Sequence, residues 1–186
     1  GDLPAARALA ARHGLRPARA LWRMAMDLDP GRGTVPPDVP PSTRLRAFVP
    51  GRDEQAWLDV NARAFDWHPE QGRMGLPDLR ARQDEPWFDP ADLLLAERGG
   101  RVVAFAWCKL EPGSDEGELY ALGVHPDAQG TGLGRALTHV VLAHLAARGR
   151  SRAVLFTEAT NTAAVRTYRS VGFVTDRVDV QHTTVG

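Results

Sequence analysis

The chain has 186 residues, enough for one complete domain and some surplus, and 43% of them are hydrophobic. Its 23 basic and 23 acidic residues give a formal net charge of zero, so we expect no general attraction to nucleic acid or to anionic membranes. Cys108 is the single cysteine, which excludes an intrachain disulfide and is typical of a cytoplasmic protein. No apolar run reaches the length of a membrane span, so we expect no membrane partner.

The N-terminal part of the sequence predicts one helix, one strand and a linker. Residues 2–13 place Ala and Leu at helical spacing and are followed by a glycine, a favoured helix stop. Residues 18–28 contain strand-like runs of Leu, Trp and Met. Residues 29–42 are rich in Pro and Gly, and we interpret them as a linker because Pro has no N–H to donate. The main domain is then expected over residues 43–186.

The main domain alternates short strands and helices. Periodicity and hydrophobic runs predict a strand at 43–49, helices at 53–65 and 77–83, strands at 93–98, 101–110 and 116–124, a helix at 134–148, a strand at 153–157, a helix at 161–170 and a strand at 173–179. Asp53 is the expected cap of the first helix, and Gly99-Gly100 has the composition of a tight hairpin turn. Antiparallel hairpins that lead into a βαβ unit predict an α/β fold with a mixed, mostly antiparallel central sheet flanked by helices.

A weak internal repeat connects the two ends of the sequence. Residues 3–15 align with residues 161–173, and Gly14 then coincides with Gly172. Two Ala-rich helices with glycine stops can align by chance. The interpretation that we favour is that residues 1–28 are the closing helix and strand of a preceding, similar domain.

A glycine-rich segment at residues 124–137 carries the strongest chemical signal. It has the pattern of a strand end, a loop with Gly130, Gly132 and Gly134, and the first turn of a helix. The three glycines are expected to let the backbone turn so that several N–H groups point into one space, and the helix start adds the positive end of its dipole. Such an arrangement binds phosphate or pyrophosphate. The loop lies late in the chain and ends without Lys-Ser/Thr, which argues against a dinucleotide-binding fold and a P-loop.

Two motifs together resemble the GCN5-related N-acetyltransferase (GNAT) family. The pattern Gln-Gly-x-Gly-x-Gly at residues 129–134 resembles the loop that binds the pyrophosphate of acetyl-CoA, and residues 161–173 resemble a second motif of that family. The resemblance covers roughly residues 43–180. It implies a GNAT fold, acetyl-CoA as co-substrate, no metal, and transfer of an acetyl group to the amine of a small molecule.

The resemblance also implies the cofactor contacts. The backbone of Leu122, Gly123 and Val124 would pair with the pantetheine arm as an added strand, and the Leu122 N–H would stabilise the developing oxyanion. Asn161 would contact the CoA arm. Its alternative, purely structural role is that of a helix cap. The residues implied to hold the pyrophosphate are Gln129, Gly130, Thr131, Gly132, Leu133, Gly134 and Arg135.

Acyl transfer to an amine needs two proton movements, for which the resemblance implies two residues. Glu118 occupies the position of a carboxylate base that deprotonates the amine, and Tyr168 that of an acid that protonates the leaving thiolate. Each residue also has an alternative interpretation without a catalytic role. Glu118 belongs to an acidic run that could be a solvated strand face, and a lone Tyr on an amphipathic helix is often a core residue.

Three segments, at residues 60–72, 85–90 and 117–124, resemble more narrowly the mycothiol synthase family. Its members are tandem GNAT proteins whose C-terminal domain acetylates the cysteinyl amine of desacetylmycothiol, a cysteine–glucosamine–inositol pseudodisaccharide. The tandem arrangement would also explain residues 1–28. The residues expected to contact the acceptor are Asp66, His68, Glu70, Trp87, Lys109 and Glu118.

One departure from that narrower pattern keeps other acceptors open. Ala106-Trp107-Cys108-Lys109 stands where the family more usually has His-Trp-Thr-Lys. The alternatives are therefore a GNAT enzyme for another small-molecule or protein amine, and a non-catalytic acyl-CoA-binding domain. For Cys108 the bland interpretation is a small, buried apolar side chain.

Overall fold

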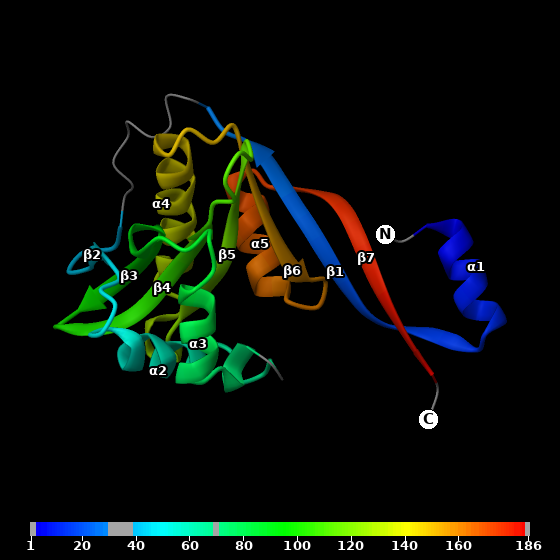
Figure 1. Ribbon diagram of the computed structural model, residues 1–186, viewed down its shortest axis with the longest axis horizontal. Helices are drawn as coiled ribbons and strands as arrows, with labels where there is room; N and C mark the ends of the chain where they lie inside the picture. Colours follow the sequence, from blue (N-terminus) through cyan, green and yellow to red (C-terminus); the bar gives the residue numbers. More distant parts are fainter. Residues whose placement is uncertain (1–2, 30–38, 69–70, 185–186) are drawn as a thin grey trace. The chain divides into compact units, whose positions relative to one another are not determined.

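The computed structural model describes residues 3–29, 39–68 and 71–184, which form two compact units (Figure 1). Of the described residues, unit 1 combines 3–27 with 154–184, and unit 2 contains 28–29, 39–68 and 71–153. The described strands are mostly antiparallel and helices flank them, so the predicted mixed α/β class is confirmed. Within the described ranges, no helix is both long enough and apolar enough to cross a membrane.

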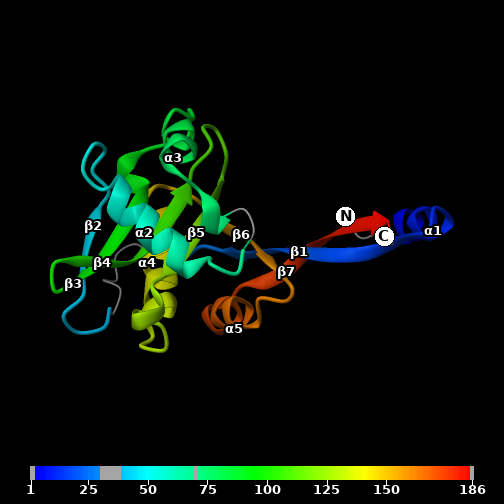
Figure 2. The same ribbon diagram turned by 90° about the horizontal axis from the view of Figure 1, so that it is seen from below.

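Unit 1 joins the two ends of the chain. Its elements are α1 (Pro4–Arg12), β1 (Leu15–Asp27), most of β6 (Arg152–Glu158), α5 (Thr162–Val171) and β7 (Val174–Thr184). The strand β1 lies between β6 and β7, and Figure 2 shows it running beside β7. The antiparallel pairing extends from Leu15 opposite Thr184 to Ala25 opposite Val174. Both strands are longer than the sequence predicts because each extends the other's ladder, with a register shift that accommodates Pro17.

Unit 2 carries the remaining elements. They are β2 (Arg44–Ala47), α2 (Glu54–Ala64), the 3₁₀ turn η2 (Gln71–Arg73), α3 (Leu76–Gln83), η3 (Pro90–Asp92), β3 (Leu93–Arg98), β4 (Arg101–Lys109), β5 (Glu116–Val124), η4 (Pro126–Ala128) and α4 (Leu133–Ala147). The strands follow the order β2-β3-β4-β5, each antiparallel to the next. In Figure 1, α2 and α3 lie on one face of these strands and α4 lies on the other.

The predicted hairpin between β3 and β4 is confirmed. Gly99 and Gly100 both have positive φ angles, +56° and +76°, which side chains disfavour and glycine accepts. Two positive φ angles give the turn a twist that matches the two flanking strands. The hairpin therefore sets the first pairs, Arg98 with Arg101 and Glu97 with Val102, and a register shift follows before Ala96 pairs with Ala104.

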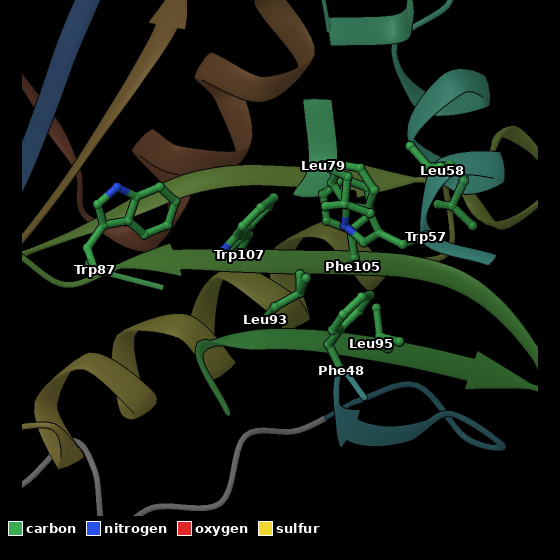
Figure 3. Packing of buried hydrophobic residues seen from close by; sticks show 10 residues of the cluster. Phe48, Trp57, Leu58, Leu79, Trp87, Leu93, Leu95, Phe105 and Trp107 are labelled. Atoms are coloured by element: carbon green, nitrogen blue, oxygen red, sulfur yellow. The ribbon is translucent and has the colours of Figure 1, made fainter. Parts of the chain in front are cut away.

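An aromatic core lies between β4 and the helices α2 and α3 (Figure 3). Alternate residues of β4 point to one face, so Phe105 and Trp107 meet Trp57 of α2 at ring distances of 4.9 and 5.5 Å. All three side chains are fully buried. Truncating a ring of this size typically costs about 3–5 kcal/mol, so this cluster is a principal source of stability in unit 2.

Asp53 stands at the expected cap position of α2, but its side chain makes no cap hydrogen bond. Its backbone is in the helical region, whereas a capping residue usually has extended angles. The carboxylate instead accepts from the Val49 amide at 2.8 Å and from the guanidinium of Arg46, with an Nη2 distance of 3.0 Å. The prediction that Asp53 caps α2 is therefore wrong, and the residue joins β2 to the start of the helix.

We expect Asp53→Asn to lower stability in a pH-dependent way. Burial alone raises the pKa of Asp53, but the hydrogen bonds from Arg46, Arg52 and Val49 outweigh it and lower the pKa to about 2. The ionised carboxylate therefore contributes roughly 2 kcal/mol at pH 7, which is lost as pH falls from about 4 to 2. Urea unfolding should show a deficit of about 2 kcal/mol at pH 7 that shrinks towards pH 2. The exposed Asp59→Asn is the control, and an equal deficit at both pH values would contradict the ionic role.

Candidate functional site

The glycine-rich loop connects the end of β5 to the start of α4 through η4. Gly130 and Gly132 have φ angles of +73° and +82°, so these two positions require glycine. Gly134 lies in the first turn of α4 without a positive φ, and a Cβ there would meet only Val124 at an ordinary 3.8 Å. The expectation that all three glycines turn the backbone is therefore wrong for Gly134.

The loop presents several unused donors. Among the described residues, the amides of Gly130, Thr131 and Gly132 have no hydrogen-bond acceptor. The first amides of α4 also lack partners within the helix, and Gly132, the N-cap residue before it, has no side chain to cap them. These donors gather at the positive end of a 15-residue helix. The arrangement fits a diphosphate, which has many acceptor oxygens and a negative charge.

Gln129 and Thr131 shape the loop by contacts within it. The Gln129 N–H donates to the Pro126 carbonyl at 3.1 Å, and its side-chain Nε2 donates to the Val124 carbonyl at 3.0 Å. The Thr131 hydroxyl donates to the Ala128 carbonyl at 2.8 Å and accepts from Arg98 Nη2 at 3.3 Å. The Gln129 amide is thus already engaged, whereas the Thr131 amide remains available.

Alanine substitutions at two loop glycines should have opposite effects on stability. Gly132→Ala forces a side chain into the left-handed region and should cost about 1–2 kcal/mol. Gly134→Ala places alanine in a helical turn with room for its Cβ, and should be neutral or stabilising by up to about 1 kcal/mol. Urea unfolding of the ligand-free protein measures both. Equal losses in the two variants would contradict this assignment of backbone roles.

The strand β5 carries an irregularity beside the aromatic core. Trp107 of β4 is opposite Ala121, but the next residue, Cys108, is opposite Leu119. Tyr120 is therefore an extra residue on β5, as in a β-bulge, which re-aims side chains and often lies next to active sites. Both Tyr120 and Ala121 pack against the aromatic core.

A cavity of about 390 Å³ opens next to this irregularity. It is lined by Arg82, Glu85, Pro86, Trp87, Lys109, Glu111 and Tyr120. The indole of Trp87 is 7% exposed, and the Lys109 ammonium lies 5.2 Å from the centre of its ring. Trp87 is therefore both a core residue and part of the wall of the cavity.

Lys109 and Glu118 are cross-strand partners at this end of the sheet. The Lys109 ammonium is 2.7 Å from Glu111 Oε1, and this hydrogen bond, together with the charges of Glu111 and Glu118, raises the pKa of Lys109. Lys109 therefore stays protonated at neutral pH. Glu118 is half-buried and adjoins the cavity through Lys109.

The departure from the narrower family pattern does not alter the cavity wall. Ala106 and Cys108 are both fully buried, and neither lines the cavity. Burial raises the pKa of the Cys108 thiol, so it remains protonated and unreactive. The interpretation of Cys108 as a small, buried side chain is confirmed.

Unit 1 holds two of the predicted residues, Asn161 just before α5 and Tyr168 within it. Asn161 is its N-terminal cap, with Oδ1 accepting from the Ala164 amide at 3.2 Å. Tyr168 is buried, with its ring 6.0 Å from that of Phe173. Burial raises the pKa of Tyr168 to about 12, so the phenol keeps its proton at neutral pH. An acid must hold a proton before it can donate one, and Tyr168 meets that condition.

The predicted acceptor residues that follow α2 lie outside the lining of the 390 Å³ cavity or outside the described residues. Glu70 lies outside the described residues. Asp66 is exposed, and His68 accepts from the Gln71 amide through Nδ1 at 3.1 Å, which supports the turn η2. Neither Asp66 nor His68 lines the 390 Å³ cavity. Of the described members of the predicted acceptor set, only Trp87 and Lys109 line it.

Among the cavity residues that sequence reasoning missed, Arg82 and Tyr120 form a hydrogen-bonded pair. The guanidinium Nε of Arg82 donates to the Tyr120 hydroxyl at 2.9 Å. A signal for Tyr120 existed, because it follows Glu118 by two residues on a strand and so shares its face. The sequence holds no signal that singles out Arg82, because α3 contains two arginines and only tertiary packing places one of them at the cavity.

A larger cavity, of about 850 Å³, lies at the opposite end of β4, beside Arg101 and Val102. Its wall is mostly charged, with the pair Arg46–Asp53 among the lining side chains. Lys109 and Arg101 are the two ends of β4, so the two cavities are separated by the length of that strand. None of the predicted site residues that the structure describes lines the larger cavity.

Comparison with known proteins gives consistent results. Residues 61–173 match the acetyltransferase (GNAT) family. The chain is 55% identical to a mycothiol acetyltransferase of Cellulomonas flavigena and 54% identical to one of Thermobispora bispora, in each case over 98% of its own length. It spans 55% and 63% of the length of these two curated relatives. A crystal structure of a GCN5-related N-acetyltransferase from Sphaerobacter thermophilus has a TM-score of 0.81 and 28% identity, covering 98% of this chain and 56% of that one.

Proposed function

Because the chain belongs to the acetyltransferase (GNAT) family, we propose that it transfers an acetyl group from acetyl-CoA to a primary amine. We further propose that the acceptor is the cysteinyl amine of desacetylmycothiol. The observation that supports this reaction is the loop at the start of α4, because its unpaired amides fit the diphosphate of CoA. The names of the relatives in Cellulomonas flavigena and Thermobispora bispora support the acceptor.

The proposed roles of the residues follow from their chemistry. Acetyl-CoA supplies an activated acetyl group as a thioester. The loop from Gln129 to Arg135 holds the diphosphate, and the Leu122 amide donates to the carbonyl oxygen on which negative charge develops. Glu118 removes a proton from the acceptor ammonium, and Tyr168 gives its proton to the departing thiolate. Asn161 contacts the CoA arm in addition to capping α5.

The share of the relatives that the chain spans supports a proposal about its organisation. We propose that residues 1–28 close a preceding GNAT-like domain, that residues 29–42 are a linker, and that residues 43–186 form the transferase domain. The preceding domain would then be a partner within the same protein. The strand β1 is nevertheless paired with β7, so it contributes to the sheet of unit 1.

A cytoplasmic location stays a prediction from the single cysteine.

Removing the two proton carriers should lower turnover without weakening cofactor binding. Glu118→Gln and Tyr168→Phe keep the shape of each side chain, so kcat should fall by about 10²–10⁴-fold while the Kd of acetyl-CoA stays within about threefold. Steady-state kinetics and calorimetry measure the two quantities. Glu116→Gln, two residues earlier on β5, is the matched control and should keep normal turnover. Near-normal kcat in both test variants would remove Glu118 and Tyr168 from the mechanism.

The acceptor is tested by comparing amines directly. Purified protein should acetylate desacetylmycothiol with a higher kcat/KM than polyamines, aminoglycosides or peptides with a free N-terminus. The same assay with a longer protein that includes the proposed preceding domain shows whether that domain contributes to turnover. Preference for another amine would overturn the acceptor but not the reaction. Binding of CoA by calorimetry without turnover on any amine would instead identify a non-catalytic acyl-CoA-binding domain.

A further inference from the structure

The wall of the 390 Å³ cavity contains a hydrogen-bonded pair of side chains, Arg82 and Tyr120. Tyr120 is the extra residue of β5, and its ring packs 5.2 Å from Trp87 and 5.4 Å from Trp107. These aromatic contacts fix the ring plane, and the Nε–Oη hydrogen bond of 2.9 Å fixes its tip. The phenol is thus held from two directions at the edge of the cavity.

The direction of that hydrogen bond determines what Tyr120 can offer to a ligand. A guanidinium has only donors, so the phenol oxygen accepts from Arg82. Its own hydrogen therefore remains to be donated elsewhere. The Arg82–Tyr120 pair presents an oriented O–H donor, and the aromatic face of Trp87 lies beside it.

The charges around the cavity are balanced. Arg82 and Lys109 contribute two positive charges, and Glu85 and Glu111 contribute two negative charges. This balance disfavours both a polyanion and a polycation as the ligand. Oriented donors and acceptors beside an indole suit a saturated ring with many hydroxyl groups, whose C–H face packs on the aromatic ring while its hydroxyls exchange hydrogen bonds.

We propose that this cavity is the subsite for the polyhydroxylated part of the acceptor, with Tyr120 as its specificity-determining donor and Arg82 as the positioning residue that orients Tyr120. This inference rests on the proposed function and deepens it. Trp87 packs on a sugar or inositol ring, and the Tyr120 hydroxyl donates to a hydroxyl of that ring. The reacting amine is directed towards Glu118, the cross-strand partner of Lys109.

The test is a split between KM and kcat. Tyr120→Phe and Arg82→Met should raise the KM for desacetylmycothiol about 5–10-fold, the typical cost of one hydrogen bond, with kcat and the KM for acetyl-CoA within about twofold. Arg80→Met, an exposed arginine on the same helix, is the matched control and should change nothing. Because Arg82 acts through Tyr120, the double variant should be no worse than Tyr120→Phe alone. Additive effects would overturn the positioning role of Arg82.

A truncated acceptor separates recognition from general damage to the fold. Cysteinamide keeps the amine and thiol but lacks the rings, so Tyr120→Phe should leave its kcat/KM unchanged. An equal loss with both acceptors, or no loss with desacetylmycothiol, would overturn the proposal.

A binding measurement keeps the proposed subsite distinct from the proposed function. Glucosaminyl-inositol should bind to the wild-type protein in calorimetry and about 5–10-fold more weakly to Tyr120→Phe. If the wild-type protein binds this ligand but does not acetylate desacetylmycothiol, the proposed function fails and the subsite stands. If it acetylates desacetylmycothiol but the wild-type protein and Tyr120→Phe bind glucosaminyl-inositol equally, the subsite fails and the function stands.

Discussion

The change of register between β4 and β5 is the constraint on which the rest of unit 2 depends. Up to Trp107 the two strands pair residue for residue, and beyond it β5 has one residue more. The extra residue lets Tyr120 and Ala121 both pack against the aromatic core, and pairing resumes with Lys109 opposite Glu118. A regular ladder would send every second side chain to the far face. The shift is thus the reason that a charged pair, an aromatic wall and a phenol surround one cavity.

Two buried carboxylates connect helices of unit 2 to its strands, one at α2 and one at α4. Asp53 connects the end of β2 to the start of α2, and Asp92, only 1% exposed, connects the start of β3 to the last turns of α4. Asp92 Oδ1 lies 2.6 Å from His144 Nε2, and Asp92 Oδ2 accepts from Arg148 Nη2 at 2.9 Å. Removing one partner from such a group leaves a buried charge uncompensated, which is strongly destabilising. The loop at the other end of α4 is therefore attached to a helix that is fixed at its far end.

The sequence predicts local features well and tertiary partnerships poorly. The Gly99-Gly100 turn and the positive φ angles of Gly130 and Gly132 follow from what glycine alone tolerates, so they can be expected from residue identity. The predictions for Asp53 and Gly134 are wrong because the roles of these residues depend on backbone angles that no short motif reveals. Arg82 could not be selected from its helix because only packing brings it to Tyr120. The glycine-rich loop is a contiguous motif, whereas the cavity is assembled from α3, β4, β5 and their connecting segments. This difference explains why the sequence alone indicates the loop and not the cavity.

The position of β1 between β6 and β7 has a consequence for how the molecule is made. Its residues pair with partners roughly 150 or more positions later in the chain, so closing this part of the sheet costs more entropy than any local hairpin does. Unit 2 is continuous in sequence and has its core within residues 48–107, which allows it to form while the chain is still being synthesised. During synthesis β1 is made long before β7. Its backbone donors and acceptors on that side therefore have no β7 partner until β7 is complete. In that interval it presents an exposed strand edge, the feature that natural sheets protect against association with other chains.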